Sequence, residues 1–289
     1  KLAAAFEAVG IVLLLFAFVP QFGAEGVWVS VFTAISAFCN AGFDLFGRFG
    51  AYSSLVPYVN NYYVQAVIMF MIMAGGLGFM VWVELAEYRK KRRLSLHAKV
   101  VLQFSVIFWV GGAVLLALLE WSNPRTMGGL SVPGKIMAAL FQSVSTRTAG
   151  MNTIDLAACS PISKLLMSVL QFIGAAPGST GGGVKVTTFA VLILTIRSVA
   201  QGRDDCVIGG HHIESKTVYR ALTIIVIGAV AAFGSAVVVY YNTAETVSVI
   251  DCIFESCSAF GTVGLSVGVT GQLNTGAKLL YMACMFMGR

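Results

Sequence analysis

Three segments of related sequence, each a short apolar run that ends in a glycine, lie between longer apolar stretches of this chain. They cover residues 32–43, 135–151 and 247–266. Each contains the pattern Phe-x-x-x-Ser followed by a glycine: Phe32, Ser36 and Gly42, then Phe141, Ser145 and Gly150, then Phe254, Ser258 and Gly264. The first is too short to cross a bilayer, which takes about 20 apolar residues. We therefore expect three re-entrant helices, each followed by a loop that turns at the glycine.

The stretches around these segments are long and apolar enough to cross a membrane. They cover residues 2–20, 62–85, 100–119, 162–200 and 218–241, and another begins at Ala277. Hydrophobic residues make up 57% of the chain and charged residues only 11%, whereas soluble domains carry about 25% charged residues. The predicted fold class is an all-α polytopic membrane protein built from repeated units of span, pore loop and span.

The units recur at intervals of about 110 residues, which indicates an internal duplication. We predict repeats over residues 1–93, 94–203 and 204–289. The basic run 89–93 marks the cytoplasmic side by the positive-inside rule, so the pore loops should enter from the outside. The chain opens with Lys1 directly before an apolar stretch and closes at Arg289 inside another. We therefore expect a fragment whose last repeat is truncated.

The glycine-bearing loops have the composition of an ion site made from backbone carbonyls. A dehydrated cation in a membrane needs oxygen atoms to replace its water, and carbonyls supply them without fixed charge. The residues predicted to do this are Asn40, Ala41, Gly42, Thr148, Ala149, Gly150, Thr262, Val263 and Gly264. Alternatively, the glycines only let helices pack closely. The threefold recurrence favours the ion site.

The apolar stretch 162–200 is too long for one span and is interrupted at residues 174–185. Five glycines and Pro177 lie in this interruption, and such a composition cannot remain helical. A helix broken at membrane depth usually lines a cavity. The alternative is a flexible kink without function.

The chain resembles the Trk, Ktr and HKT superfamily of potassium transporters, and most closely the Ktr-type membrane subunit. The most specific stretches are Ser36-Ala-Phe-Cys-Asn-Ala-Gly-Phe-Asp44, Thr146-Arg-Thr-Ala-Gly150 and Ser258-Ala-Phe-Gly-Thr-Val-Gly-Leu265. That family has four repeats around one pseudo-fourfold pore, with one filter glycine per repeat. The resemblance implies that this chain holds repeats two to four and lacks the first.

The resemblance also implies the function and the partners. We expect potassium uptake across the bacterial plasma (inner) membrane, with possible sodium dependence, by a homodimer in contact with membrane lipid and gated by a cytosolic nucleotide-binding ring. The family has an intramembrane gating loop below the filter. The implied gate residues are Gly174, Gly178, Ser179, Thr180, Gly181, Gly182, Gly183 and Arg289.

Two other classes of function stay open from the residues alone. One is a secondary transporter whose broken helices surround a midplane substrate site, although its repeats are usually inverted and these run in one direction. The other is a structural membrane subunit. We predict no enzymatic activity, no resident metal beyond the potassium ion and no nucleic-acid partner.

The remaining charged residues give weaker signals. Arg147 lies beside a predicted filter, and we expect it to brace the loop from behind through a carboxylate, with Glu255 and Asp251 as candidates. Asp44 either attracts cations at the pore mouth or caps the next turn. The pair His211–His212 is more typical of a solvated loop than of a metal site, because no other ligands cluster with it.

Overall fold

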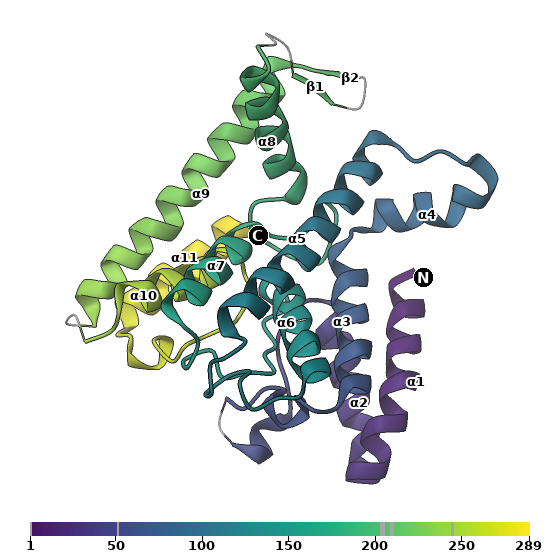
Figure 1. Ribbon diagram of the computed structural model, residues 1–289, viewed down its shortest axis with the longest axis vertical. Coiled ribbons are helices and arrows are strands. Elements are labelled where there is room, and N and C mark those ends of the chain that lie inside the picture. The colour runs from purple at the N-terminus through teal and green to yellow at the C-terminus, as the bar shows by residue number, and fades with distance from the viewer. Residues whose placement is uncertain (1, 51, 203–205, 209–210, 244–245) are drawn as a thin grey trace.

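The computed structural model describes residues 2–50, 52–202, 206–208, 211–243 and 246–289, and this part of the chain is mostly helical (Figure 1). Its α-helices are α1 (Leu2–Phe22), α2 (Glu25–Phe38), α3 (Tyr62–Gly76), α4 (Phe79–Lys91), α5 (Leu96–Glu120), α6 (Val132–Thr146), α7 (Pro161–Phe172), α8 (Val186–Ala200), α9 (Ser215–Asn242), α10 (Val249–Phe260) and α11 (Thr275–Gly288). Short 3-10 helices lie in the connections: η1 (Phe46–Phe49), η2 (Val56–Tyr58) and η3 (Thr270–Gln272). A small antiparallel hairpin of β1 (Cys206–Ile208) and β2 (His211–Ile213) joins α8 to α9. The predicted all-α membrane fold is confirmed.

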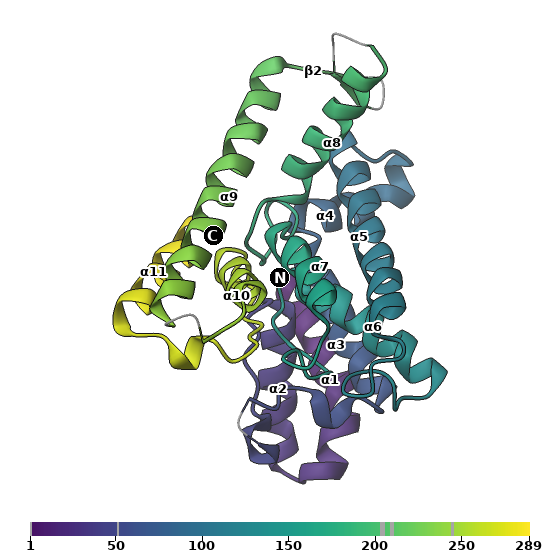
Figure 2. The same ribbon diagram turned by 60° about the vertical axis from the view of Figure 1, so that its left-hand side comes forward.

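The helices form three successive groups, each with a short helix between two others. The groups are α1–α2–α3, α5–α6–α7 and α9–α10–α11, and the members of each group pack on one another. The groups meet where α3 packs on α6 and where α7 packs on α10. The β1–β2 hairpin lies at the end of the molecule away from α2, α6 and α10 (Figures 1 and 2). The boundaries that we gave to the repeats stay predictions.

The expected span 62–85 is not one straight helix. It is divided into α3 and α4, whose axes differ in direction by 97°. The break lies at Leu77 and Gly78, where Gly78 has a φ of +85°, a conformation that interrupts a right-handed helix and that glycine adopts without steric cost. Among the described helices, α1, α5 and α9 are long and apolar enough to cross a membrane, and the bent pair would make a fourth span.

Side-chain caps explain where four of the shorter helices begin. A residue at each N-cap accepts a hydrogen bond from a backbone N–H of the first turn, which would otherwise lack a partner. These caps are Ser131 for α6, Ser160 for α7, Ser248 for α10 and Asn274 for α11. With Ser131 as its cap, α6 begins at Val132, before the start at Lys135 that the apolar pattern predicted.

The distribution of polar and apolar residues is that of a membrane protein. Large apolar side chains on the long helices are exposed, including Phe16 (72%), Leu118 (73%) and Val230 (68%). The short helix α6 instead buries hydroxyl side chains such as Ser145 and Thr146. Because lipid can cover apolar outer faces but cannot satisfy polar groups, polar groups gather around the interior of the bundle.

Candidate functional site

The three glycine loops (residues 40–42, 148–150 and 262–264) share a local hydrogen bond that accounts for the serine in the repeated pattern. In each unit the serine hydroxyl of the short helix donates to the carbonyl oxygen of the residue that follows the glycine. The pairs are Ser36 and Phe43 (2.6 Å), Ser145 and Met151, and Ser258 and Leu265 (2.7 Å). This bond returns the chain towards its own helix, and it fixes the turn at the glycine.

Left-handed backbone conformations shape the same turns. The φ angles of Gly42, Gly150 and Gly264 are +76°, +78° and +93°, a region that costs a residue with a Cβ roughly 1–2 kcal/mol. Asn40 (φ +51°) and Thr262 (φ +52°) are left-handed as well. Asparagine tolerates this region, whereas β-branched threonine does not usually enter it. The surrounding structure therefore holds Thr262 in place.

The glycine loops converge, although they are far apart in the sequence. A Cβ atom added to Gly42 would lie 2.6 Å from the carbonyl oxygen of Ala149 and 3.4 Å from that of Val263. One added to Gly150 would overlap the Val263 carbonyl oxygen, while one added to Gly264 would lie 3.9 Å from the Gly150 Cα. The structure thus brings all three predicted filter segments to one place, with carbonyl oxygens facing glycine backbone.

A loop over residues 174–185, called the intramembrane loop after its expected position, joins α7 to α8 where the sequence predicted a break. Its two ends run side by side, because the amide of Gly174 donates to Val184 (2.9 Å) and the amide of Val184 donates to Phe172 (3.1 Å). Its tip then lies against the glycine loops. A Cβ added to Gly181 would lie 2.5 Å from Thr148 Cγ2, and one added to Gly182 would overlap the Thr262 hydroxyl.

The broken helix α3–α4, which the sequence did not predict, holds the other side of this loop. The amides of Ala176 and Thr180 donate to the carbonyls of Gly76 (3.0 Å) and Gly75 (3.2 Å) at the end of α3. The amide of Phe79, the first residue of α4, donates to Gly178 (3.1 Å). The helix break therefore frees backbone groups that the loop uses as partners.

Two basic side chains donate hydrogen bonds to carbonyl oxygens of this loop. The guanidinium of Arg289 donates to the carbonyl of Thr180, next to the place where the Gly183 amide donates to Gly288 (2.9 Å). Lys185 Nζ donates to the Gly181 carbonyl at 2.7 Å. Arg289 thus lies with the loop, as expected, and Lys185 is a further cation there that the sequence analysis did not assign.

The expected carboxylate partner of Arg147 is wrong. Arg147 is only 4% exposed, and its guanidinium donates to the Gly174 carbonyl (2.7 Å) and lies 5.4 Å from the ring centre of Phe108. Among the described residues, Glu255 instead accepts hydrogen bonds from its own outer loop, including the amides of Val267 and Val269 (both 3.1 Å). Arg147 therefore braces the first residue of the intramembrane loop through the carbonyl of Gly174, and its guanidinium is itself packed on the ring of Phe108.

The other candidate, Asp251, forms an ion pair with Lys164 at 2.7 Å that joins α10 to α7. Asp44 accepts a hydrogen bond from the Phe46 amide (2.9 Å) and so forms a local turn that leads into η1. The side chains of His211 and His212 lie outside the part of the structure that is described. In the described part, His, Cys, Asp and Glu residues form no group able to hold a metal ion.

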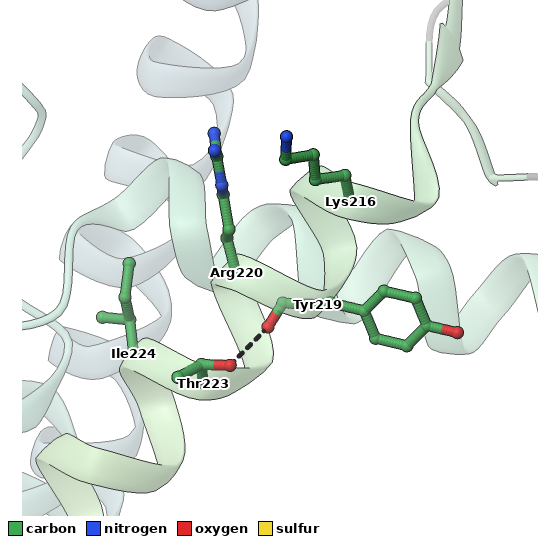
Figure 3. A pocket seen from close by; sticks show the side chains of 5 residues that line it. All are labelled: Lys216, Tyr219, Arg220, Thr223 and Ile224. Carbon is green, nitrogen blue, oxygen red and sulfur yellow. Dashed lines mark hydrogen bonds between the residues drawn. The ribbon is translucent and has the colours of Figure 1, made fainter.

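A surface hollow of about 600 Å³ lies away from the glycine loops, at the start of α9 (Figure 3). Lys216 and Arg220 line it together with Tyr219, Thr223 and Ile224, and the Thr223 hydroxyl donates to the Tyr219 carbonyl (2.8 Å). Because Lys216 and Arg220 would repel a cation, this hollow does not suit a cation path.

Replacing Arg147 by glutamine should destabilise the protein. The substitution removes a buried charge-assisted hydrogen bond, worth about 1.5–3 kcal/mol, together with its contact to Phe108. We expect the melting temperature of the full-length protein in detergent to fall by about 5 °C. The melting temperature of Arg147→Lys, which keeps a cation, should fall less. Arg125→Gln on the exposed outer loop is the matched control. An unchanged melting temperature in Arg147→Gln would contradict the bracing role.

Comparison with known proteins agrees with this architecture. The family model described as TrkH, cation transport protein, matches residues 1–289. The chain is 36% identical to the potassium/sodium uptake protein NtpJ of Enterococcus hirae over 292 residues, covering 100% of this chain and 63% of that protein. It is 37% identical to the Ktr system potassium uptake protein B of Vibrio alginolyticus over 286 residues, covering 98% of this chain and 61% of that protein.

A solved structure shows the same fold. The potassium transporter TrkH from Vibrio parahaemolyticus superposes with a TM-score of 0.77 at 18% identity, covering 99% of this chain and 59% of that one. The chain thus spans about three fifths of the length of these relatives. The full match to the family model and the identity to the uptake proteins lead to one conclusion: this chain belongs to the TrkH family of membrane cation transport proteins.

Proposed function

We propose that this chain supplies three walls of a pore that conducts potassium ions inward across the bacterial plasma membrane. The observation that carries the proposal is the convergence of the three glycine loops, with the carbonyl oxygens of Ala149 and Val263 facing the neighbouring glycines. A ring of carbonyls can replace the water of a potassium ion at membrane depth. The short helices α2, α6 and α10 also end at the loops, and the negative ends of their dipoles favour a cation there.

The intramembrane loop is the proposed gate. Its tip lies against Thr148 and Thr262, so an ion that leaves the filter towards the cytosol meets the loop. Arg289 and Lys185, which donate to loop carbonyls, add positive charge that would raise the barrier to a cation. A closed position of this loop would therefore block the path both sterically and electrostatically.

We propose the partners from the family. The full protein would work as a homodimer, regulated by a nucleotide-binding ring on its cytosolic face. The relative in Vibrio alginolyticus is named as protein B of a Ktr system, which supports a membrane subunit that works with other components. Sodium dependence is proposed on the same basis, because the Enterococcus hirae relative is named as a potassium/sodium uptake protein.

The proposed function predicts that the full-length gene restores growth of a potassium-uptake-deficient bacterium at low external potassium. Uptake of potassium measured in those cells should exceed that of cells with an empty vector, and repeating the assay with and without sodium tests the proposed dependence. A well-expressed, membrane-inserted protein that leaves uptake at the level of the empty vector would contradict the proposal.

A further inference from the structure

The tip of the intramembrane loop meets the first residue of each glycine loop in order. Thr180 contacts Asn40 through a hydrogen bond, and Gly181 and Gly182 lie against Thr148 and Thr262. Consecutive loop residues thus face the corresponding position in successive repeats. The loop touches the glycine loops at the same level on all three sides that this chain supplies.

A chain of side-chain hydrogen bonds runs through the first of these contacts. The Thr148 hydroxyl donates to Asn40 Oδ1 (3.0 Å), Asn40 Nδ2 donates to the Thr180 hydroxyl (2.7 Å), and that hydroxyl donates to the Phe38 carbonyl (3.0 Å). Asn40 is 5% exposed and Thr148 is 3% exposed. A single amide therefore joins two glycine loops to the intramembrane loop, with its oxygen towards one and its nitrogen towards the other.

Burial makes this arrangement sensitive to the loop's position. When the loop moves away, Asn40 Nδ2 loses its shortest hydrogen bond, since its other contacts, to the carbonyls of Phe38 and Ile72, are 3.4 and 3.5 Å long. A buried donor without a good partner is costly, so the amide would turn to find one. Turning would release the hydroxyl of Thr148, which begins the next glycine loop.

We propose, resting on the filter and the gate assigned above, that Thr180 is a positioning residue that couples the gate to the filter. The hydrogen bond that its hydroxyl accepts from Asn40 holds the intramembrane loop in place and, through Asn40, supports the glycine loop that begins at Thr148. Loss of this hydrogen bond changes the preference for potassium over sodium as well as the rate of uptake. Arg289 contacts the carbonyl of Thr180 and takes no part in this hydrogen-bond chain, so its loss affects the rate alone.

The test compares isosteric substitutions in the full-length protein, with potassium uptake and its inhibition by sodium as readouts. Thr180→Val removes the hydroxyl, and we expect uptake to rise about three- to tenfold and the preference for potassium over sodium to fall by a similar factor, which corresponds to one hydrogen bond. Thr180→Ser keeps the hydroxyl and should behave as the parent protein. Arg289→Gln should raise uptake with the preference unchanged.

A double-mutant cycle locates the effect in the Thr180–Asn40 contact. Asn40→Gly removes the amide and tolerates the left-handed backbone at φ +51°, and Thr180→Val should add nothing in that background. Thr223→Val is the matched control, because its hydroxyl bonds within exposed α9. A Thr180→Val protein with unchanged preference, or with effects that add to those of Asn40→Gly, would overturn the coupling. Failure of the parent protein to transport potassium would instead refute the proposed function.

Discussion

We expect potassium uptake to fall about tenfold or more when Gly150 is replaced by alanine. Two physical costs coincide at this position. An alanine at φ +78° is strained, and its Cβ would overlap the carbonyl oxygen of Val263. Strain of this kind costs about 1–3 kcal/mol, and relieving the overlap moves a carbonyl that we assign to the filter. Uptake in a potassium-uptake-deficient bacterium measures the effect.

The other glycine loops give a graded series. A Cβ at Gly42 would lie 2.6 Å from a carbonyl oxygen, whereas the nearest atom to a Cβ at Gly264 is 3.9 Å away. Gly264→Ala therefore suffers from its φ angle alone and should lose less uptake than Gly150→Ala or Gly42→Ala. The matched control is Gly129→Ala in the outer loop, where a Cβ meets no atom within 4 Å.

Equal membrane levels of all four proteins, checked by immunoblot, separate a filter defect from poor folding. If Gly150→Ala transports normally at a normal level, then its carbonyl neighbours do not form the ion path and the filter assignment is wrong. If all three loop variants fail equally, then strain at φ, rather than the packing of neighbouring carbonyls, controls the site.

The glycine loops could be found from the sequence because their chemistry is local. The serine and its acceptor carbonyl, as in Ser258 and Leu265, are seven residues apart, so one repeated motif contains the whole turn. The break in 174–185 was equally clear, since clustered glycine and proline exclude a helix. The all-helical membrane class followed from composition and from the length of the apolar stretches.

The break between α3 and α4 was missed because its glycines have two roles. Glycines within an apolar helix favour close packing, and Gly75 does pack against the carbonyl of Phe38, which a Cβ there would overlap. Gly78 is what turns the chain, and its φ of +85° depends on contacts with the intramembrane loop that lie far along the sequence. The low helix propensity of glycine does not by itself distinguish a glycine at a helix contact from a glycine at a hinge.

The partners of the buried polar groups were the hardest part to predict. Arg147 was expected to need a carboxylate, yet it uses the carbonyl of Gly174 and an aromatic ring. Every residue carries a carbonyl, so such a partner has no signature in the sequence. The bond from Asn40 to Thr180 joins positions 140 residues apart, and only the assembled fold brings them together.

Deletion of residues 178–182 should raise potassium uptake several-fold and make it less dependent on the proposed regulatory partner. The structure makes this deletion feasible, because the Gly174 amide bonds the Val184 carbonyl at 2.9 Å and the Val184 amide bonds the Phe172 carbonyl at 3.1 Å. These bonds hold the two ends of the loop together, and all three residues remain in the shortened chain. The tip that lies against Thr148 and Thr262 is what disappears.

A companion substitution separates the steric part of the gate from its charge. Arg289→Gln keeps the loop and removes one cation that we place beneath the filter, so its uptake should lie between those of the parent protein and the deletion. Arg289→Lys, which keeps the charge, should stay near the parent rate. Uptake that stays unchanged in the deletion, with the protein present in the membrane at its normal level, would mean that ions do not pass this loop. Residues 178–182 would then serve only to turn the chain between α7 and α8.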